Sequence, residues 1–238
     1  MNKSVVVVNG ANGDIGFLLV QALLKADYAV AACVRSIENS KFDAAEDLTL
    51  FECDFSDTTS IEQCVSSIKQ TYKSIFGIIN CVGIPHGASF MMLKNDDFEQ
   101  VFKINYFAPV AFTQQLVRKM LKKRQGSIVN IASTAGILSD SGTLAYGASK
   151  AALIHSTKVM GTELGAYGIR VNAIAPAVVE SRMSDLMDEN SIRALDQKAD
   201  LCSKIYPQEI VDMVLYLLSD SSKNLTKQVL TIDRGITQ

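Results

Sequence analysis

The sequence predicts an α/β fold in which one doubly wound parallel sheet of about seven strands carries helices on both faces. Short apolar runs alternate along the chain with amphipathic segments of helical periodicity, and this βαβα order is typical of parallel sheets with right-handed crossovers. Runs such as "VVVV" and "SIVNI" lack alternating polar residues, as expected for strands covered on both faces. The 238 residues contain no low-complexity linker and no fixed-period repeat, so we expect a single domain over residues 1–238.

Each strand and helix of this pattern can be placed along the chain. Apolar runs rich in β-branched residues predict strands at 4–8, 28–34, 48–53, 75–81, 126–132, 169–175 and 227–232. Amphipathic periodicity predicts helices over 15–26, 58–72, 97–123, 147–167 and 208–219. Because the strands are parallel, their carboxyl ends meet at one edge of the sheet, where ligands bind in such folds.

The segment from 177 to 206 does not follow the alternation. It contains the polar stretch "SRMSDLMDEN", and the dipeptide "YP" follows at 206–207. A surface helix pair and a mobile cover over a site are both compatible with this composition. Because the segment comes just after the carboxyl end of a predicted strand, we favour the cover.

The composition is that of an ordinary globular protein. Hydrophobic residues make up 48% of the chain and the net charge is −2, so no basic excess points to nucleic acid. The basic cluster "RKMLKKR" at 118–124 is expected at a helix end, where cations oppose the helix dipole. No apolar run is long enough to cross a bilayer, and the strand pattern at the N-terminus leaves no room for a secretory signal. We therefore expect a cytoplasmic protein with no nucleic-acid and no membrane partner.

Metal sites and disulfides are not expected. The five cysteines form no Cys-x-x-Cys pair and lie mostly within apolar patterns, which favours reduced side chains that serve packing. The two histidines, His86 and His155, do not complete a zinc constellation. His86 follows the fourth predicted strand, and with "LSDSG" at 138–142 it is expected to border a pocket at the carboxyl edge.

The loop "NGANGDIG" at 9–16 joins the first predicted strand to the first predicted helix. Gly10 allows a tight turn, and Gly16 lets the helix approach the sheet closely. A helix N-terminus offers unpaired N–H groups to a pyrophosphate, yet Asp14 places a negative charge there. We expect Asp14 as an N-cap or first-turn residue whose carboxylate accepts backbone N–H bonds. Taken alone, the loop is compatible with a nucleotide site or with a plain strand-to-helix corner.

The segment "YGASK" carries Tyr146 and Lys150, four residues apart on a predicted helix and therefore on one face. An ammonium near a phenol stabilises tyrosinate and lowers the tyrosine pKa. Ser133, at the end of the strand "SIVNIAS", supplies a hydroxyl that can orient a carbonyl oxygen beside the Tyr146 hydroxyl. A Tyr-x-x-x-Lys pair alone is common and usually structural, so the other motifs decide.

Together, the motifs resemble those of the short-chain dehydrogenase/reductase family, in the family's order and over nearly the whole chain. "NGANGDIG" resembles its Thr-Gly-x-x-x-Gly-x-Gly loop, and "CDFSD" the segment whose aspartate contacts adenine. "NCVG" at 80–83 is similar to its Asn-Asn-Ala-Gly, and "KIN" supplies the helix asparagine. "SIVNIASTAG" and "YGASK" carry the serine, tyrosine and lysine, "VNAIAPAVVES" resembles the Pro-Gly segment, and "QVLTIDRG" the terminal strand.

Several residues depart from the family pattern. Asn9 stands in place of threonine, and Asp14 in place of the loop's middle glycine. Glycines are replaced by Ala177 and by Arg234. Cys81 and Val82 replace asparagine and alanine. None of these changes removes a catalytic group, so they bear on cofactor affinity and loop geometry and leave the reaction class intact.

The resemblance implies a Rossmann-like fold, hydride transfer between a nicotinamide and a carbonyl or alcohol carbon, and a catalytic set of Asn105, Ser133, Tyr146 and Lys150. Tyr146 would act as acid/base and Ser133 would orient the carbonyl. Lys150 would lower the Tyr146 pKa and bind the nicotinamide ribose, while Asn105 would hold a water that links Lys150 to solvent. The implied cofactor-binding residues are Gly10, Asn12, Ile15, Gly16, Arg35, Ser36, Asp54, Phe55, Asn80, Gly83, Tyr146, Lys150, Pro176, Val179 and Ser181.

The second predicted strand ends "AACVRS", and its last residues indicate which dinucleotide is bound. NAD-specific members place an acidic residue here for the ribose hydroxyls, whereas this chain has Val34, Arg35 and Ser36. An arginine binds a 2′-phosphate bidentately. NADP is therefore favoured over NAD, although the glycine loop lacks the basic residue of many NADP-dependent relatives.

Within the family, the chain is most similar to the β-ketoacyl-acyl carrier protein reductases, which implies a small-molecule or acyl-thioester substrate. A dehydrogenase of a sugar or other small alcohol and a non-catalytic NADP-binding sensor or scaffold are the alternatives. The intact set of four catalytic residues argues against the sensor. The resemblance also implies a homotetramer or homodimer that buries the helices at 97–123 and 147–167.

Overall fold

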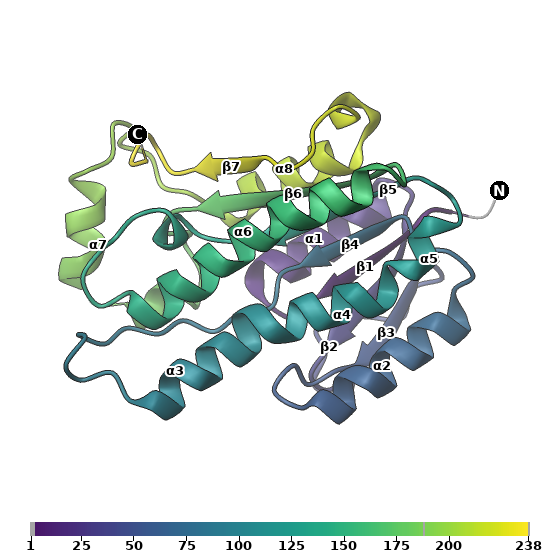
Figure 1. Ribbon diagram of the computed structural model, residues 1–238, viewed down its shortest axis with the longest axis horizontal. Coiled ribbons are helices and arrows are strands. Elements are labelled where there is room, and N and C mark those ends of the chain that lie inside the picture. Colours follow the sequence, from purple (N-terminus) through teal and green to yellow (C-terminus); the bar gives the residue numbers. More distant parts are fainter. Residues whose placement is uncertain (1–2, 188, 238) are drawn as a thin grey trace.

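A single parallel sheet of seven strands forms the centre of the computed structural model, which describes residues 3–187 and 189–237 (Figure 1). The strand order is β3-β2-β1-β4-β5-β6-β7, so the chain returns from β3 at one edge to place β4 beside β1. The strands are β1 Val5–Asn9, β2 Ala29–Val34, β3 Leu48–Glu52, β4 Gly77–Asn80, β5 Gly126–Ile131, β6 Ile169–Pro176 and β7 Val229–Ile232. The predicted doubly wound α/β fold is confirmed.

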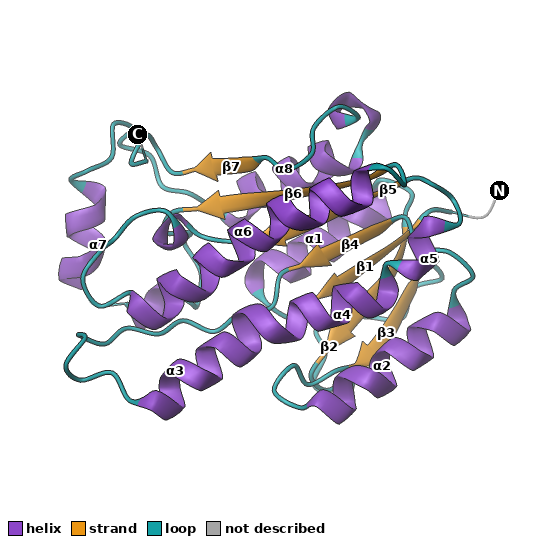
Figure 2. Cartoon of the chain, viewed as in Figure 1, coloured by secondary structure: helices purple, strands orange, loops and turns teal. Residues whose placement is uncertain are grey.

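Helices cover both faces of the sheet (Figure 2). Helices α1 and α8 lie on one face, and α2, α4 and α6 lie on the other (Figure 1). The helices are α1 Asp14–Lys25, α2 Thr58–Thr71, α3 Asn95–Phe102, α4 Ala108–Leu116, α5 Arg118–Leu121, α6 Leu144–Gly165, α7 Glu189–Asp196 and α8 Pro207–Leu218. None of these helices, within the described ranges, is long and apolar enough to cross a bilayer.

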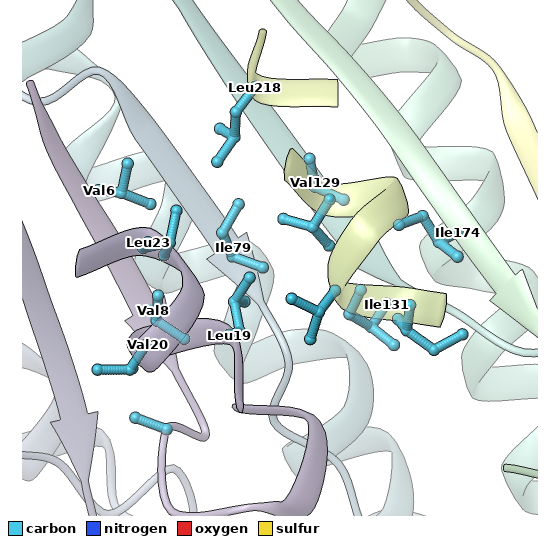
Figure 3. Packing of buried hydrophobic residues seen from close by; sticks show 14 of the residues in the cluster. Val6, Val8, Leu19, Val20, Leu23, Ile79, Val129, Ile131, Ile174 and Leu218 are labelled. Carbon is cyan, nitrogen blue, oxygen red and sulfur yellow. The ribbon is translucent and has the colours of Figure 1, made fainter. Parts of the chain in front are cut away.

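The strand β1 shows why its sequence lacks polar alternation. Val6 and Val8 pack under α1, whose Leu19 and Leu23 belong to the same buried cluster (Figure 3). Val7 points to the opposite face and packs among the residues beneath α2 and α4. Because each valine is fully buried, each contributes about 1.5–3 kcal/mol of hydrophobic stabilisation. The sheet is therefore a rigid platform for the side chains at its carboxyl edge.

The helix expected at 97–123 is interrupted. A π-helical turn, Lys103–Phe107, separates α3 from α4, and α5 is a further short piece. The turn has Asn105 at its centre, buried and hydrogen-bonded to the loop after β4. π turns within α-helices occur frequently at functional sites. The other long helix, α6, begins three residues earlier than expected, so Tyr146 lies in its first turn.

The segment 177–206, called the cover below, lies beyond the carboxyl ends of the strands (Figure 1). It contains a short 3₁₀ turn, Ser184–Leu186, and the helix α7, and a bridge between Val179 and Ile205 closes its base. The described residues of this segment, 177–187 and 189–206, therefore form one α-helix and one 3₁₀ turn in place of a helix pair.

The C-terminal segment holds the later part of the cover. The carbonyl of Arg234 accepts hydrogen bonds from Asp200 and Leu201, at 2.9 and 3.1 Å. The Arg234 guanidinium is nearly buried, lies 2.7 Å from Asp196 and donates to the Ser203 carbonyl. Arg234 adopts a positive φ of 61°, which is costly without glycine, and these contacts offset that cost.

Candidate active site

Ser133, Tyr146 and Lys150 converge just beyond the carboxyl end of β5. Ser133 is the N-cap of a 3₁₀ turn after β5, where its Oγ accepts the Ala135 N–H at 3.2 Å. Tyr146 and Lys150 occupy successive turns of α6, and the Ser133 hydroxyl lies near enough to the Tyr146 phenol to lower the pKa of that phenol. The Lys150 ammonium lies 5.7 Å from the centroid of the Tyr146 ring. A hydroxyl, a phenol and an ammonium therefore lie close together at the end of β5. General acid–base chemistry requires such an arrangement.

The Lys150 ammonium is buried next to the backbone. Nζ donates to the Ile131 carbonyl at 2.9 Å, and the residue is only 4% exposed. Burial lowers the pKa of Lys150 to about 8, and the neighbouring Cys81 partly opposes this shift. Burial likewise raises the pKa of the Cys81 thiol to about 11. Lys150 therefore titrates much closer to neutral pH than a solvated lysine.

The pKa of Tyr146 is shifted upward, whereas the sequence analysis expected it to be lowered. Burial raises its pKa, and the Ser133 hydroxyl lowers it only in part. The physical reason is that a phenolate loses its hydration in this enclosed position. Tyr146 is consequently protonated at neutral pH, and the raised pKa makes its phenol a weaker acid than a solvated one.

Asn105 ties three elements together at the edge of this group. Its amide accepts the Ile84 N–H at 2.8 Å and donates to the Ile84 carbonyl at 3.0 Å. The amide also donates to the Ser149 hydroxyl at 3.3 Å, and Ser149 in turn donates to the Tyr146 carbonyl. The π turn therefore fixes both the loop after β4 and the first turn of α6.

A row of buried asparagines, which we call the asparagine ladder, lies beneath the site. Sequence reasoning singled out Asn80 as a cofactor residue and Asn9 as a departure from the family's threonine, but it did not predict that they form a row. Asn9, Asn80 and Asn130 are register partners on β1, β4 and β5. Their amides donate in sequence at 2.6 Å each, from Asn9 to Asn80 and from Asn80 to Asn130. The sequence signal was available, because "VVVVN", "GIIN" and "SIVN" each bring an asparagine after an apolar run.

The ladder also shapes the turn after β4. Asn9 Oδ1 accepts the N–H groups of Cys81 and Val82, at 2.8 and 2.9 Å. This places Gly83 so that a β-carbon there would lie 3.4 Å from both Lys150 Nζ and Asn105 Oδ1. The replacement of the family's threonine by Asn9 therefore has a structural use, since one amide oxygen holds two backbone donors.

The glycine loop is closely packed at two points. Gly10 has a φ of +68°, and a β-carbon there would lie 2.8 Å from the Val82 nitrogen. At Gly16 a β-carbon would lie 2.3 Å from the Gly10 carbonyl oxygen. Gly13 is the N-cap of α1 and provides no side-chain cap, so the first N–H groups of the helix remain available to a ligand. Unpaired N–H groups at a helix N-terminus suit an anion such as a phosphate group.

Asp14 is the first residue of α1, within the expected first turn, but its hydrogen-bond donors come from the cover. Its two carboxylate oxygens accept Arg182 Nε at 2.7 Å and the Arg182 backbone N–H at 2.8 Å. Lys41 Nζ lies 3.8 Å from the same carboxylate. The acidic residue in the loop is therefore paired with cations.

Comparison with known proteins agrees with this geometry. A family profile described as Enoyl-(Acyl carrier protein) reductase matches residues 10–237. A 3-oxoacyl-(acyl-carrier-protein) reductase of Rickettsia bellii is 31% identical over 233 residues, 97% of this chain and 95% of the relative. The chain belongs to the short-chain dehydrogenase/reductase family. It is an oxidoreductase of that family.

Other relatives of this short-chain dehydrogenase/reductase point the same way. A 3-oxoacyl-(acyl-carrier-protein) reductase of Thermotoga maritima is 35% identical over 180 residues, 76% of this chain and 73% of the relative. A solved reductase of that activity from Brucella melitensis superimposes with a TM-score of 0.87 at 25% identity, covering 100% of this chain and 92% of that one. The structure of ElxO with NADP bound has a TM-score of 0.88 at 24% identity over 98% of both chains, which supports the Rossmann-like fold alone.

The nucleotide-site residues expected after β2 and β3 lie near one another. Arg35 is exposed, and its charge helps to lower the pKa of Asp54, after the larger effect of hydrogen bonds from Ser56. Ser36 Oγ accepts hydrogen bonds from Asn39. The Phe55 ring, in contrast, is buried against Phe112 at 5.3 Å, so this side chain serves the core.

The remaining expected cofactor residues line the base of the cover and the glycine loop. Pro176 ends β6, Val179 forms the bridge to Ile205, and Ser181 Oγ donates to the Val179 carbonyl at 3.1 Å. Asn12 joins the glycine loop to the segment after β2, donating to the Asn39 carbonyl and accepting the Lys41 N–H. Ile15 is half-buried behind the loop. Across the described ranges, no three His, Cys, Asp or Glu side chains gather in a way that suits a metal ion.

Proposed function

We propose that this short-chain dehydrogenase/reductase is an NADP-dependent carbonyl reductase that acts on 3-oxoacyl thioesters. The observation that carries the proposal is the meeting of the Ser133 hydroxyl, the Tyr146 phenol and the Lys150 ammonium at the carboxyl end of β5. A bound nicotinamide supplies the hydride for the carbonyl carbon. The protein supplies proton transfer, orientation and a desolvated setting.

The mechanism follows from the protonation states of the side chains. Ser133 donates a hydrogen bond to the substrate carbonyl and holds its oxygen beside Tyr146. Tyr146 is protonated at neutral pH, and it gives its proton to the developing alkoxide. Lys150, with a pKa near 8, stabilises the resulting tyrosinate and binds the nicotinamide ribose. Asn105 holds the loop after β4 in place beside Lys150. It would also hold the water that resupplies the proton.

The preference for NADP is supported by charge. Arg35 follows β2 and is exposed, with no acidic residue at the end of the strand to repel a 2′-phosphate. ElxO, of similar fold, has NADP bound in its solved structure. The backbone cradle of Gly10, Gly13 and Gly16 would take the pyrophosphate, while Asp54 would contact the adenine.

The acyl-thioester substrate is supported by the relatives. Those of Rickettsia bellii and Thermotoga maritima are 3-oxoacyl-(acyl-carrier-protein) reductases, and the matching family profile also names an acyl carrier protein. A dehydrogenase of sugars or other small alcohols would use the same catalytic group and is the second candidate within the family.

A substrate panel tests the proposal. Purified protein is given NADPH with acetoacetyl thioesters, keto sugars and simple ketones, and the loss of NADPH absorbance is followed. We expect turnover on thioesters, which Tyr146→Phe lowers about 10²- to 10⁴-fold while NADPH binding is kept. Turnover confined to keto sugars would select the dehydrogenase. NADPH binding without turnover on any carbonyl would select a sensor.

A further inference from the structure

Asp14 and Arg182 form a clasp between the glycine loop and the cover, although they are 168 residues apart in sequence. The clasp consists of the Arg182 Nε–Asp14 bond at 2.7 Å, the Arg182 backbone N–H bond at 2.8 Å, and a bond from Arg182 Nη2 to the Asn12 carbonyl at 3.3 Å. Arg182 therefore contacts the carboxylate and the loop backbone at once. Both residues are charged, and the Asp14 side chain is only 26% exposed.

The position of the carboxylate makes this pairing important. Asp14 begins the helix whose N–H groups would receive the pyrophosphate, so an unpaired carboxylate there would repel the phosphates and compete for the helix N-terminus. Arg182 neutralises that charge through two of its own N–H groups. Lys41, at 3.8 Å and held by the Asn12 side chain, adds a weaker second cation.

We propose that Arg182 is a positioning residue for the dinucleotide, which acts through Asp14 by cancelling the charge of its carboxylate beside the glycine loop. The inference rests on the proposed function, because it assumes that a dinucleotide occupies the loop. It accounts for an acidic residue in a phosphate-binding turn. In this arrangement both carboxylate oxygens of Asp14 are paired with Arg182 of the cover.

Four proteins test this inference by NADPH binding, measured as the dissociation constant from cofactor fluorescence: the unmodified protein, Arg182→Gln, Asp14→Asn and the double variant. We expect Arg182→Gln to weaken binding about tenfold, because it exposes the Asp14 carboxylate to the phosphates. Asp14→Asn should bind at least as tightly as the unmodified protein. The double variant should return to within about threefold of it, since neither charge remains.

Two further measurements separate this role from a general loss of structure. Arg182→Lys should recover part of the affinity, and the KM for NADPH of Arg182→Gln should rise while kcat at saturating NADPH stays within about twofold. Lys204→Gln is the matched control, because Lys204 and Glu180 form an ion pair of 2.7 Å elsewhere in the cover. This control should leave NADPH affinity unchanged.

Each remaining outcome has a definite meaning. Unchanged affinity in Arg182→Gln would overturn the inference. A double variant as weak as Arg182→Gln would also overturn it, because Arg182 would then act on the phosphates directly. Absence of NADPH binding by the unmodified protein would instead overturn the proposed function, so the two failures are distinguishable.

Discussion

At the scale of single residues, Lys150 is the most costly side chain of the site. Its ammonium is 4% exposed and donates to one backbone carbonyl, and burial lowers its pKa to about 8. A pKa lowered from 10.5 corresponds to a stability penalty of roughly 3 kcal/mol for the folded protein. In the proposed proton transfer, this charge beside Tyr146 stabilises the tyrosinate.

Replacing Lys150 by methionine should therefore stabilise the fold while abolishing turnover. In the unmodified protein the penalty is fully present below pH 8, where folded Lys150 is charged, and it disappears as the pH rises from 8 towards 10.5. Urea unfolding of Lys150→Met should show a gain of about 1–3 kcal/mol at pH 7 that shrinks at pH 9. Lys158→Met, an exposed site on the same helix, is the control. A destabilised Lys150→Met at pH 7 would contradict this account.

Arg35 gives a second prediction at this scale. Arg35→Ala should raise the KM for NADPH about tenfold or more, because a charged hydrogen bond to the 2′-phosphate is lost, and it should leave the KM for NADH unchanged. Initial rates with both cofactors measure the difference. Arg118→Ala removes an exposed arginine far from β2 along the chain and should change neither value. Equal preference for NADPH and NADH in the unmodified protein would refute the choice of cofactor.

At the scale of elements, the asparagine ladder connects the sheet to the site. It runs from β1 through β4 to β5 and ends on α6, where Asn130 donates to Thr157 at 2.8 Å. Each amide is buried and hydrogen-bonded, so the row fixes the relative positions of the strand ends. The turn that presents Gly83 to Lys150 depends directly on it.

Asn9→Ala should break this row at its first member. The backbone donors of Cys81 and Val82 would lose their acceptor, so we expect the free energy of unfolding to fall by about 2–4 kcal/mol. Urea denaturation measures the change, and kcat should fall with it because the turn at Gly83 moves. Asn224→Ala, at an exposed position, should stay within about 0.5 kcal/mol. A similar small effect for Asn9→Ala would show that the ladder is not structural.

Sequence reasoning located the strands, but it did not predict the side-chain hydrogen bonds that join them to other parts of the chain. Apolar runs identified all seven strands, because buried parallel strands must be apolar on both faces. The break in the helix at 103–107 was not predictable from periodicity, since it depends on Asn105 bonding to Ile84 on another element. Likewise, the sequence indicated that Asp14 begins a helix, whereas its partner Arg182 is fixed only by the folded chain.

At the scale of the whole molecule, the expected homotetramer or homodimer stays a prediction, and exposed apolar side chains on the long helices are candidates for its interface. Phe107, after α3, is 60% exposed, and Val159 on α6 is 42% exposed. Large exposed apolar side chains are typical of surfaces that other subunits cover. These side chains belong to the helices for which burial between subunits was expected.

Phe107→Glu should therefore shift the protein to smaller species. A buried carboxylate without a partner is strongly unfavourable, so light scattering should report a smaller species than the unmodified protein gives. Tyr216→Glu, at a ring 41% exposed on α8, places the same charge on the opposite face of the sheet and should leave the mass unchanged. A monomeric unmodified protein would contradict the expected assembly.

The bonding of Arg234 to the cover has a practical consequence for anyone who purifies this enzyme. A purification tag fused on the carboxyl side of Arg234 is expected to disturb the bonds of this residue. Its carbonyl and guanidinium bind Asp196, Asp200 and Ser203. The strand β1 begins at the opposite end of the sheet from α7, at the right of Figure 1, so a tag fused ahead of it would lie away from these contacts. Assays that compare substrates should accordingly use amino-terminal tags or none.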